Sequence, residues 1–357
     1  MQFISLRELE AEAKRRLDPA VYDYFAGGAD DEITLGANEA AFSRISLIPR
    51  VLRGAGERDL KVTLLGQRIS MPVVIAPTAF HRLADPEGEC ATARAAHVAG
   101  TIMVASMAST VAIEDLAVTE GNLWFQIYIQ PDLSFTEAIV RRAEAAGCGA
   151  LVVTVDSPVF GRRERDIRNG FVDLPPGMSC ENLREAAEAG RMSRARSIVF
   201  SPKLSWGEIE WLRRTTRLKI VLKGIMHPDD ARIAVECGTD ALLISNHGGR
   251  QLDTVPAAIE LLPAIVDAVG GSIPFLVDGG IRRGTDIVKA LALGASAVAI
   301  GRPVLWALAI AGFDGVVRLL ETLRSEVDRA LALCGCSSPR DLSSNFVHFG
   351  RSEAPWL

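Results

Sequence analysis

Residues 274–302 read PFLVDGGIRRGTDIVKALALGASAVAIGR, which predicts one strand, one helix and a second strand in succession. Two short apolar runs, Pro274–Asp278 and Ser296–Gly301, show no alternation with polar residues. Parallel strands that are buried on both faces have this composition. The segment Thr285–Leu293 between them has the length of a helix, and Gly294 follows it, as expected where a helix ends. This stretch therefore indicates neighbouring parallel strands joined by a helix.

The same alternation runs from residue 72 onward and predicts eight strands. The other six are expected at Val73–Ala76, Ile102–Ala105, Trp124–Ile127, Ala150–Val155, Lys219–Lys223 and Ala241–Ser245. Further helix-length segments are Pro86–Ala99, Leu133–Ala146, Pro228–Cys237 and Pro256–Val269. This rhythm favours an α/β fold with one closed (β/α)8 barrel, the TIM barrel, over an open doubly wound sheet. An open sheet would more naturally show a GxGxxG motif after its first strand, and none is present there.

The chain of 357 residues is expected to form a single domain around this barrel. The barrel would occupy residues 72–312, with helices from residues 1–45 packed outside it and a closing helical segment at residues 313–350. Between residues 172 and 203 the periodicity breaks down, and Pro175-Pro176-Gly177 precedes a run rich in Arg and Glu. We expect this long loop after the fourth strand to be a mobile lid over the barrel mouth.

Composition restricts the classes of function. The net charge is −5 and there is no basic block with interleaved aromatics, so a nucleic-acid partner is not expected. No stretch approaches roughly 18 uninterrupted apolar residues, so no membrane partner is expected. An N-terminus unlike a secretory signal and an end without Ser-Lys-Leu favour a cytoplasmic location. Six scattered cysteines are expected to be reduced, and Cys334-Gly335-Cys336 lacks partner histidines, so no metal site is expected.

Polar residues follow nearly every expected strand at its C-terminal end, where a TIM barrel has its active site. In chain order they are Pro77-Thr78-Ala79, Ser106, Gln126, Tyr128, Thr154, Asp156, Lys223, Ser245, His247, Arg250, Asp278-Gly279-Gly280-Ile281-Arg282 and Gly301-Arg302. Chance placement would scatter such residues over both ends of the barrel. We therefore expect these residues to converge on one site.

The last two groups predict a phosphate site. They follow the seventh and eighth strands, where barrels commonly bind phosphate through backbone N–H groups, and Arg302 would add a charged contact. Either group alone would be read as a turn with a surface charge. Ser106, Gln126 and Thr154 could hydrogen-bond a flat heterocycle, so the combination indicates flavin mononucleotide (FMN). Lys223 would place a cation beside a group that becomes negative, although a lysine at the barrel rim with an exposed head is the alternative.

The segment Ser245–Asp253 combines a base with an anion-binding group. His247 and Arg250 are separated by two glycines, which let the backbone turn sharply and approach a ligand. The histidine can exchange a proton near neutral pH, and the planar guanidinium matches a carboxylate. This pattern predicts chemistry on a small organic acid.

From about Leu6 to Cys336 the chain resembles the FMN-dependent L-2-hydroxy acid oxidases and dehydrogenases, the family of glycolate oxidase, lactate oxidase and mandelate dehydrogenase. The matching motifs are Tyr22-Asp23-Tyr24, Ala76-Pro77-Thr78-Ala79, Gln126-Ile127-Tyr128, Thr154-Val155-Asp156, Gly161-Arg162-Arg163, Ser245–Asp253 and Asp278–Arg283. The resemblance implies that His247 is the active-site base and that Asp156 stabilises its imidazolium form. It also implies that Arg250 and Tyr24 grip the substrate carboxylate.

The resemblance extends to the remaining residues. Arg163 would be a second cationic contact, and Tyr128 would hydrogen-bond the substrate hydroxyl or the developing carbonyl. Lys223 would lie beside the N1–C2 edge of the flavin. Flavin and ribityl contacts would come from Pro77–Ala79, Ser106, Gln126, Thr154 and Ser245, and ribityl and phosphate contacts from Asp278–Arg282, Gly301 and Arg302. A homo-oligomer, tetramer or octamer, is also implied.

One position departs from the pattern of several glycolate-type members. They carry a tryptophan two residues after the match to Ser106, where this chain has Ala108. Loss of the indole should open the side-chain pocket, with Phe160 as one apolar wall. We therefore expect a preference for larger or aromatic, mandelate-like substrates over glycolate, although pocket size is worth only about 1–3 kcal/mol per group.

The expected activity is oxidation of an L-2-hydroxy acid to the 2-oxo acid, with O2 as acceptor and H2O2 as product. A soluble dehydrogenase that passes electrons to a quinone or a carrier protein is the alternative. An FMN-dependent isomerase of diphosphates would not need the carboxylate-binding Arg250. A non-catalytic flavin- or acid-binding protein would not need His247, Tyr128 and Asp156 together.

Overall fold

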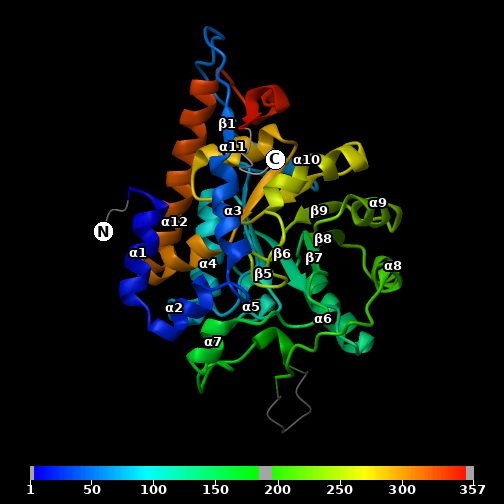
Figure 1. The fold of residues 1–357 in the computed structure, drawn as a ribbon. Helices are drawn as coiled ribbons and strands as arrows, with labels where there is room; N and C mark the ends of the chain where they lie inside the picture. The colour runs from blue at the N-terminus through cyan, green and yellow to red at the C-terminus, as the bar shows by residue number, and fades with distance from the viewer. Residues whose placement is uncertain (1–3, 185–194, 351–357) are drawn as a thin grey trace, which may run out of the picture.

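The computed structural model describes residues 4–184 and 195–350, and it confirms the predicted TIM barrel (Figure 1). The eight strands are β4 (Val73–Ile75), β5 (Ile102–Ser106), β6 (Asn122–Ile127), β7 (Ala150–Thr154), β8 (Lys219–Ile225), β9 (Ala241–Ile244), β10 (Phe275–Val277) and β11 (Ala297–Ile300). They pair in parallel in chain order, and β11 pairs with β4 to close the barrel. Each predicted strand agrees with the observed one to within two residues at either end.

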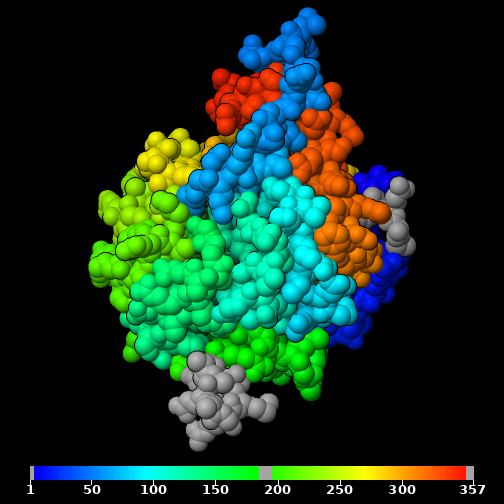
Figure 2. Space-filling view, turned by 180° about the vertical axis from the view of Figure 1, so that it is seen from behind, coloured from blue at the N-terminus to red at the C-terminus, as the bar shows by residue number. Residues whose placement is uncertain are grey.

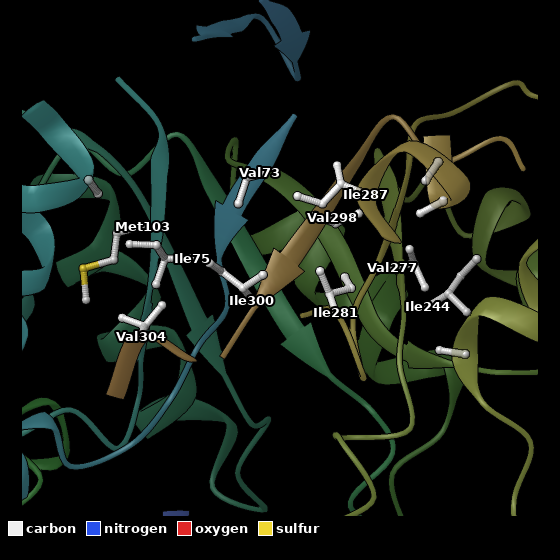
Figure 3. Close-up of a cluster of buried hydrophobic side chains, with 14 of the residues drawn as sticks. Val73, Ile75, Met103, Ile244, Val277, Ile281, Ile287, Val298, Ile300 and Val304 are labelled. Atoms are coloured by element: carbon white, nitrogen blue, oxygen red, sulfur yellow. The ribbon is translucent and has the colours of Figure 1, made fainter. Parts of the chain in front are cut away.

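Helices cover the outside of the barrel. Those between the strands are α4 (Glu89–Ala99), α5 (Ile113–Ala117), α6 (Leu133–Ala145), α7 (Glu164–Arg168), α8 (Trp206–Thr215), α9 (Pro228–Glu236), α10 (Ala258–Val269) and α11 (Gly284–Ala292). Figure 3 shows outward-facing residues of the strands: Ile75 and Ile300 lie near Val304, and Val298 lies near Ile287 of α11. Side chains on the other face of the strands fill the barrel interior, so both faces are buried. This double burial explains why the strand sequences are apolar without alternation.

A hairpin that the sequence analysis did not predict closes the N-terminal end of the barrel. It consists of β2 (Val62–Leu64) and β3 (Gln67–Ile69). Leu64 and Ile69 are buried against the interior side chains, and Trp124 Nε1 donates a hydrogen bond of 2.6 Å to Gln67 Oε1. With this end filled, the opposite end, where the strands terminate, is left for a site.

The N-terminal segment forms α1 (Leu6–Arg16), α2 (Pro19–Ala26) and α3 (Ile33–Ser43) outside the barrel. The C-terminal helix α12 (Arg302–Cys334) has non-helical backbone angles at Ala311 and Gly312. Its length and apolar composition would by themselves allow it to cross a membrane. In this fold, α12 instead packs along α1, α4 and α11, which accounts for its apolar residues.

The expectation that helix continues to residue 350 was wrong. Gly335 ends α12 with a positive φ of 70°, and two short 3-10 turns, Pro339–Asp341 and Ser344–Phe346, follow it. The chain then forms β12 (Val347–Phe349), which pairs antiparallel with β1 (Ile45–Leu47). Figure 2 shows where this pairing lies. Segments from the two ends of the chain, in blue, orange and red, project together from one end of the molecule.

Part of the predicted lid loop at residues 172–203 lies outside the described residues, namely 185–194. On the near side of that gap, Asn182 is fully buried. Its Oδ1 accepts a hydrogen bond of 2.8 Å from the Ile113 N–H, and its Nδ2 donates to the Ser106 and Val111 carbonyls at 3.3 Å. This side of the loop is therefore fixed to the segment after β5.

Candidate active site

His247 and Asp156 form a hydrogen-bonded pair at the C-terminal end of the barrel. His247 Nδ1 lies 2.9 Å and 3.2 Å from the two carboxylate oxygens, and the His247 backbone N–H donates to Ser245 Oγ at 3.0 Å. Burial lowers the pKa of His247 to about 4, against the opposing effect of Asp156. Burial works to raise the pKa of Asp156, but His247 and Lys223 outweigh it and lower the pKa to about 2. At neutral pH the pair is an uncharged imidazole donating to a carboxylate, which leaves Nε2 as a proton acceptor.

Six buried residues from neighbouring strands form what we call the polar belt: Ser106, Gln126, Thr154, Lys223, Ser245 and Asp278. Ser106 Oγ donates to Gln126 Oε1 at 3.1 Å, and Gln126 Nε2 donates to Thr154 Oγ1 at 3.0 Å. Lys223 Nζ donates to Ser245 Oγ at 3.1 Å and lies 3.8 Å from Asp278 Oδ2. The structure thus brings together the residues that the sequence placed after consecutive strands.

Arginines gather on the same side of the molecule. Arg250 Nη1 donates to the carbonyls of Tyr24 and Gly27 at 2.7 and 2.9 Å. Arg302 Nη2 donates to the Gly27 carbonyl at 2.8 Å and Arg302 Nη1 to the Gly248 carbonyl at 3.0 Å. Burial, and then the charges of neighbouring arginines, lower the pKa of Arg250 to about 10 and that of Arg302 to about 9. Because buried like charges are unfavourable without a counter-charge, this cluster suits anionic ligands.

Among residues 4–184 and 195–350, three buried polar atoms that belong to predicted site residues have no hydrogen-bond partner. They are Arg163 Nε, Arg282 Nε and Asp278 Oδ1. Arg282 also pairs with Glu39 at 2.9 Å and lies over the Trp306 ring at 5.0 Å. Buried polar atoms are normally satisfied, so these atoms indicate a ligand with hydrogen-bonding groups. A sugar-alcohol chain at Asp278 and a phosphate at Arg282 would satisfy two of them, which fits FMN.

The Asp278–Arg282 loop is shaped by glycine. Gly280 has a φ of +77°, and a Cβ there would lie 1.9 Å from the Asn38 carbonyl oxygen. The Asn38 side chain exchanges two amide hydrogen bonds with Asn246, at 2.9 and 2.8 Å. Helix α3 therefore holds this loop and the His247 loop together. The Ile281 side chain is only 2% exposed and belongs to the core, so only its backbone could face a cofactor.

The loops after β4 and β11 meet beside these groups. Thr78 Oγ1 lies 2.7 Å from Nε2 of the buried His81, and a Cβ at Gly301 would lie 3.2 Å from Thr78 Cγ2. Pro77, Thr78 and Ala79 are partly exposed, in contrast to the strand that precedes them. Their main-chain groups are therefore accessible at the barrel mouth.

The predicted substrate contacts lie among aromatic rings. The Tyr24 ring is 5.1 Å from the Arg250 guanidinium carbon and also packs on Phe80 and Phe171. Burial raises the pKa of both Tyr24 and Tyr128, so both are neutral donors. Ala108 is buried, and its N–H donates to Ser106 Oγ at 3.1 Å.

A second aromatic group adjoins Tyr128. Phe160 is 58% exposed, and the Arg163 guanidinium carbon lies 4.1 Å from its ring centroid. Phe200, which the sequence analysis did not select, contacts Tyr128 edge-on at 5.2 Å and Phe160 at 5.7 Å. The short apolar run Ile198-Val199-Phe200, which ends a stretch rich in Arg, Glu and Ser, was the available signal for it.

Known proteins are similar to this chain over nearly its whole length. The protein-family model for FMN-dependent dehydrogenase matches residues 13–349. L-lactate oxidase from Nostoc sp. is 48% identical over 97% of this chain and 98% of the relative. Glycolate oxidase from Spinacia oleracea is 46% identical over 97% and 96%. A solved mandelate oxidase variant with (S)-mandelic acid has a TM-score of 0.90 and 44% identity over 97% of this chain and 98% of that one. The chain therefore belongs to the FMN-dependent dehydrogenase family, and its cofactor is FMN.

Proposed function

We propose that this protein oxidises an L-2-hydroxy acid to the 2-oxo acid, with O2 as electron acceptor and H2O2 as the second product. The observation that carries the proposal is the hydrogen bond between His247 and Asp156, three residues from the partly buried Arg250. A base and a carboxylate-binding group on one loop match a substrate that carries both a hydroxyl and a carboxylate. Relatives named for oxidation of lactate and glycolate support the same reaction class.

Each site residue has a separate role in the proposed reaction. Arg250 and Tyr24 hold the substrate carboxylate, and Tyr128 donates to the substrate hydroxyl oxygen. His247 Nε2 takes the hydroxyl proton, and Asp156 stabilises the imidazolium that forms. When bound, FMN would supply the two-electron redox chemistry, and the two electrons and two protons removed from the substrate would reduce O2 to H2O2. Lys223, fixed by Ser245, supplies positive charge beside the flavin.

We further propose a preference for larger or aromatic side chains. Ala108 is a buried methyl-bearing residue and lacks the bulk of a tryptophan, and Tyr128, Phe160 and Phe200 provide apolar surface. Solved neighbours of similar fold contain (S)-mandelic acid and benzoyl-formic acid. Replacing Ala108 with Trp should move the preference toward glycolate by about 10- to 100-fold in the ratio of kcat/KM values. An unchanged ratio would refute the pocket argument.

The central test is anaerobic reduction of the yellow holoprotein. Added (S)-mandelate or L-lactate should bleach the flavin absorbance, and admitted air should restore it with one H2O2 per substrate. If a quinone restores the absorbance and air does not, the protein is a dehydrogenase and not an oxidase. The matched variant His247→Gln should bind FMN and yet bleach slower by roughly 100-fold or more. Absence of bleaching with every 2-hydroxy acid in the wild type would reject the proposal.

A further inference from the structure

A cavity of about 240 Å³ lies outside the barrel wall, next to the candidate active site. Apolar side chains of Val153, Val199, Phe200, Leu204, Ile209 and Ile225 contribute to its lining. Tyr128 also lines it, although Tyr128 is a proposed contact of the substrate hydroxyl. The cavity and the substrate site therefore share a wall, which contains Tyr128 and Phe200.

Phe200 connects the aromatic group beside Tyr128 with the cavity. Its ring contacts Tyr128 at 5.2 Å and Phe160 at 5.7 Å, and it also lines the cavity. The ring is half-buried. A side chain with packed rings on one side and open volume on the other can turn toward that volume without entering occupied space.

The backbone beside Phe200 is held by hydrogen bonds, whereas its ring packs against two other rings. The Val199 N–H donates to Gln130 Oε1 at 2.9 Å, and Gln130 Nε2 donates to the Tyr128 carbonyl at 3.0 Å. Gln130 is itself buried. This bridge fixes the start of the Phe200 segment relative to Tyr128, so a change in the ring position would come from side-chain rotation.

We propose that Phe200 is a movable wall of the substrate side-chain pocket and that the cavity receives its ring when a large side chain binds. This inference rests on the proposed function and specifies the substrate class: L-2-hydroxy acids with aryl or branched alkyl side chains, as well as small ones. Most of the exposed surface of the cavity is apolar, although Glu208 and Asp230 also line it, so the ring keeps a mainly apolar environment in both positions. Cavity volume then sets the largest side chain that the site accepts.

Filling the cavity tests the proposal. Leu204 is 38% exposed at the cavity edge, so Leu204→Trp can add volume there without entering the barrel core. The ratio of kcat/KM for (S)-mandelate to that for L-lactate should fall about tenfold. Leu333→Trp, at a 70% exposed position of α12 that does not line the cavity, is the matched control and should keep the wild-type ratio. The double variant Phe200→Ala, Leu204→Trp should recover much of the lost ratio, because no ring then needs the space.

A measurement without turnover separates this inference from the proposed function. Benzoylformate and pyruvate can be titrated against the oxidised holoprotein and followed by flavin absorbance. The ratio of their Kd values should change about tenfold in Leu204→Trp and not in Leu333→Trp. If the wild type bleaches with 2-hydroxy acids but both ratios are unchanged in Leu204→Trp, the movable wall is refuted and the proposed function stands. If no 2-hydroxy acid bleaches the wild type, the proposed function fails first.

Discussion

His247 Nδ1 lies 2.9 Å from Asp156 Oδ1 although 91 positions separate the two residues in the chain. They follow β9 and β7, with β8 between these strands in the barrel. The contact fixes the tautomer of the imidazole, because the carboxylate accepts from Nδ1 and leaves Nε2 unprotonated. Catalysis should therefore depend on the charge of Asp156 and not only on its shape.

Replacement of Asp156 with Asn should keep the side-chain volume and remove the negative charge. We expect kcat to fall by roughly 100-fold or more, since the imidazolium loses its stabilising partner. FMN affinity, measured by fluorescence titration, should change little. Asp132→Asn, which alters an exposed helix cap on α6, is the control. Near-normal turnover in Asp156→Asn would remove this carboxylate from the mechanism.

The low pKa of His247 predicts an unusual pH profile. The base must be unprotonated, so kcat/KM should fall only as pH drops toward about 4, and should be flat near 6.5. The free energy of unfolding should change with pH in the same direction as activity. Between pH 6.5 and 4 an unfolded histidine binds a proton that the folded one does not, so the free energy of unfolding decreases as pH falls through this window. An activity limb centred at pH 6.5 would contradict the burial of the imidazole.

Arg250→Lys should weaken substrate binding more than preservation of charge suggests. The guanidinium is held by the Tyr24 and Gly27 carbonyls through one nitrogen, which leaves other N–H groups in a fixed plane for a carboxylate. An ammonium cannot reproduce that geometry, so we expect kcat/KM to drop about 100-fold. Steady-state kinetics with (S)-mandelate and binding of benzoylformate would measure it. If kcat/KM and the affinity for benzoylformate both fall less than threefold, the guanidinium does not bind the carboxylate through two hydrogen bonds.

Two adjacent arginines should differ in their effect on cofactor binding. Arg282 has a buried Nε without a partner in the described part of the chain, whereas Arg283 pairs with Glu326 at an exposed position. Arg282→Gln should raise the Kd for FMN by about 10- to 100-fold, as expected for loss of a charged hydrogen bond. Arg283→Gln should leave that Kd within about twofold. Equal effects of the two substitutions would disprove a phosphate contact at Arg282.

Gly280→Ala should destabilise the fold far more than another glycine with a similar backbone. Both Gly280 and Gly54 have positive φ, 77° and 70°, but only at Gly280 would the new Cβ collide with a carbonyl oxygen, that of Asn38. At Gly54 there is open space, so only backbone strain of about 1 kcal/mol is expected. Thermal denaturation should show a clearly larger loss for Gly280→Ala, with reduced FMN content. Similar losses of stability in the two variants would mean that α3 can move aside for the new Cβ at little energetic cost.

Some features could not be predicted from local pattern. The β2–β3 hairpin was missed because its strands, Val62–Leu64 and Gln67–Ile69, mix apolar and polar residues and bury only one side chain each, so they lack the continuous apolar run of the barrel strands. Phe200 was missed because its contact with Tyr128 spans 72 positions and a long loop. Arg302 was expected at the phosphate, but its side chain also donates to carbonyls of α2 and the His247 loop, a fastening role that sequence spacing did not reveal.

Local residue patterns were enough to predict the barrel and the end of it at which the candidate site lies. Strands buried on both faces must be apolar, so they stand out locally, and polar residues after them mark the C-terminal end. Only the tertiary structure decided which of those residues touch, including the His247–Asp156 pair, the unpaired atoms of Asp278 and Arg282, and the cavity behind Phe200. Burial of a strand is a property of a few consecutive residues, whereas side-chain contacts across the mouth depend on how the barrel closes and how distant loops pack on it.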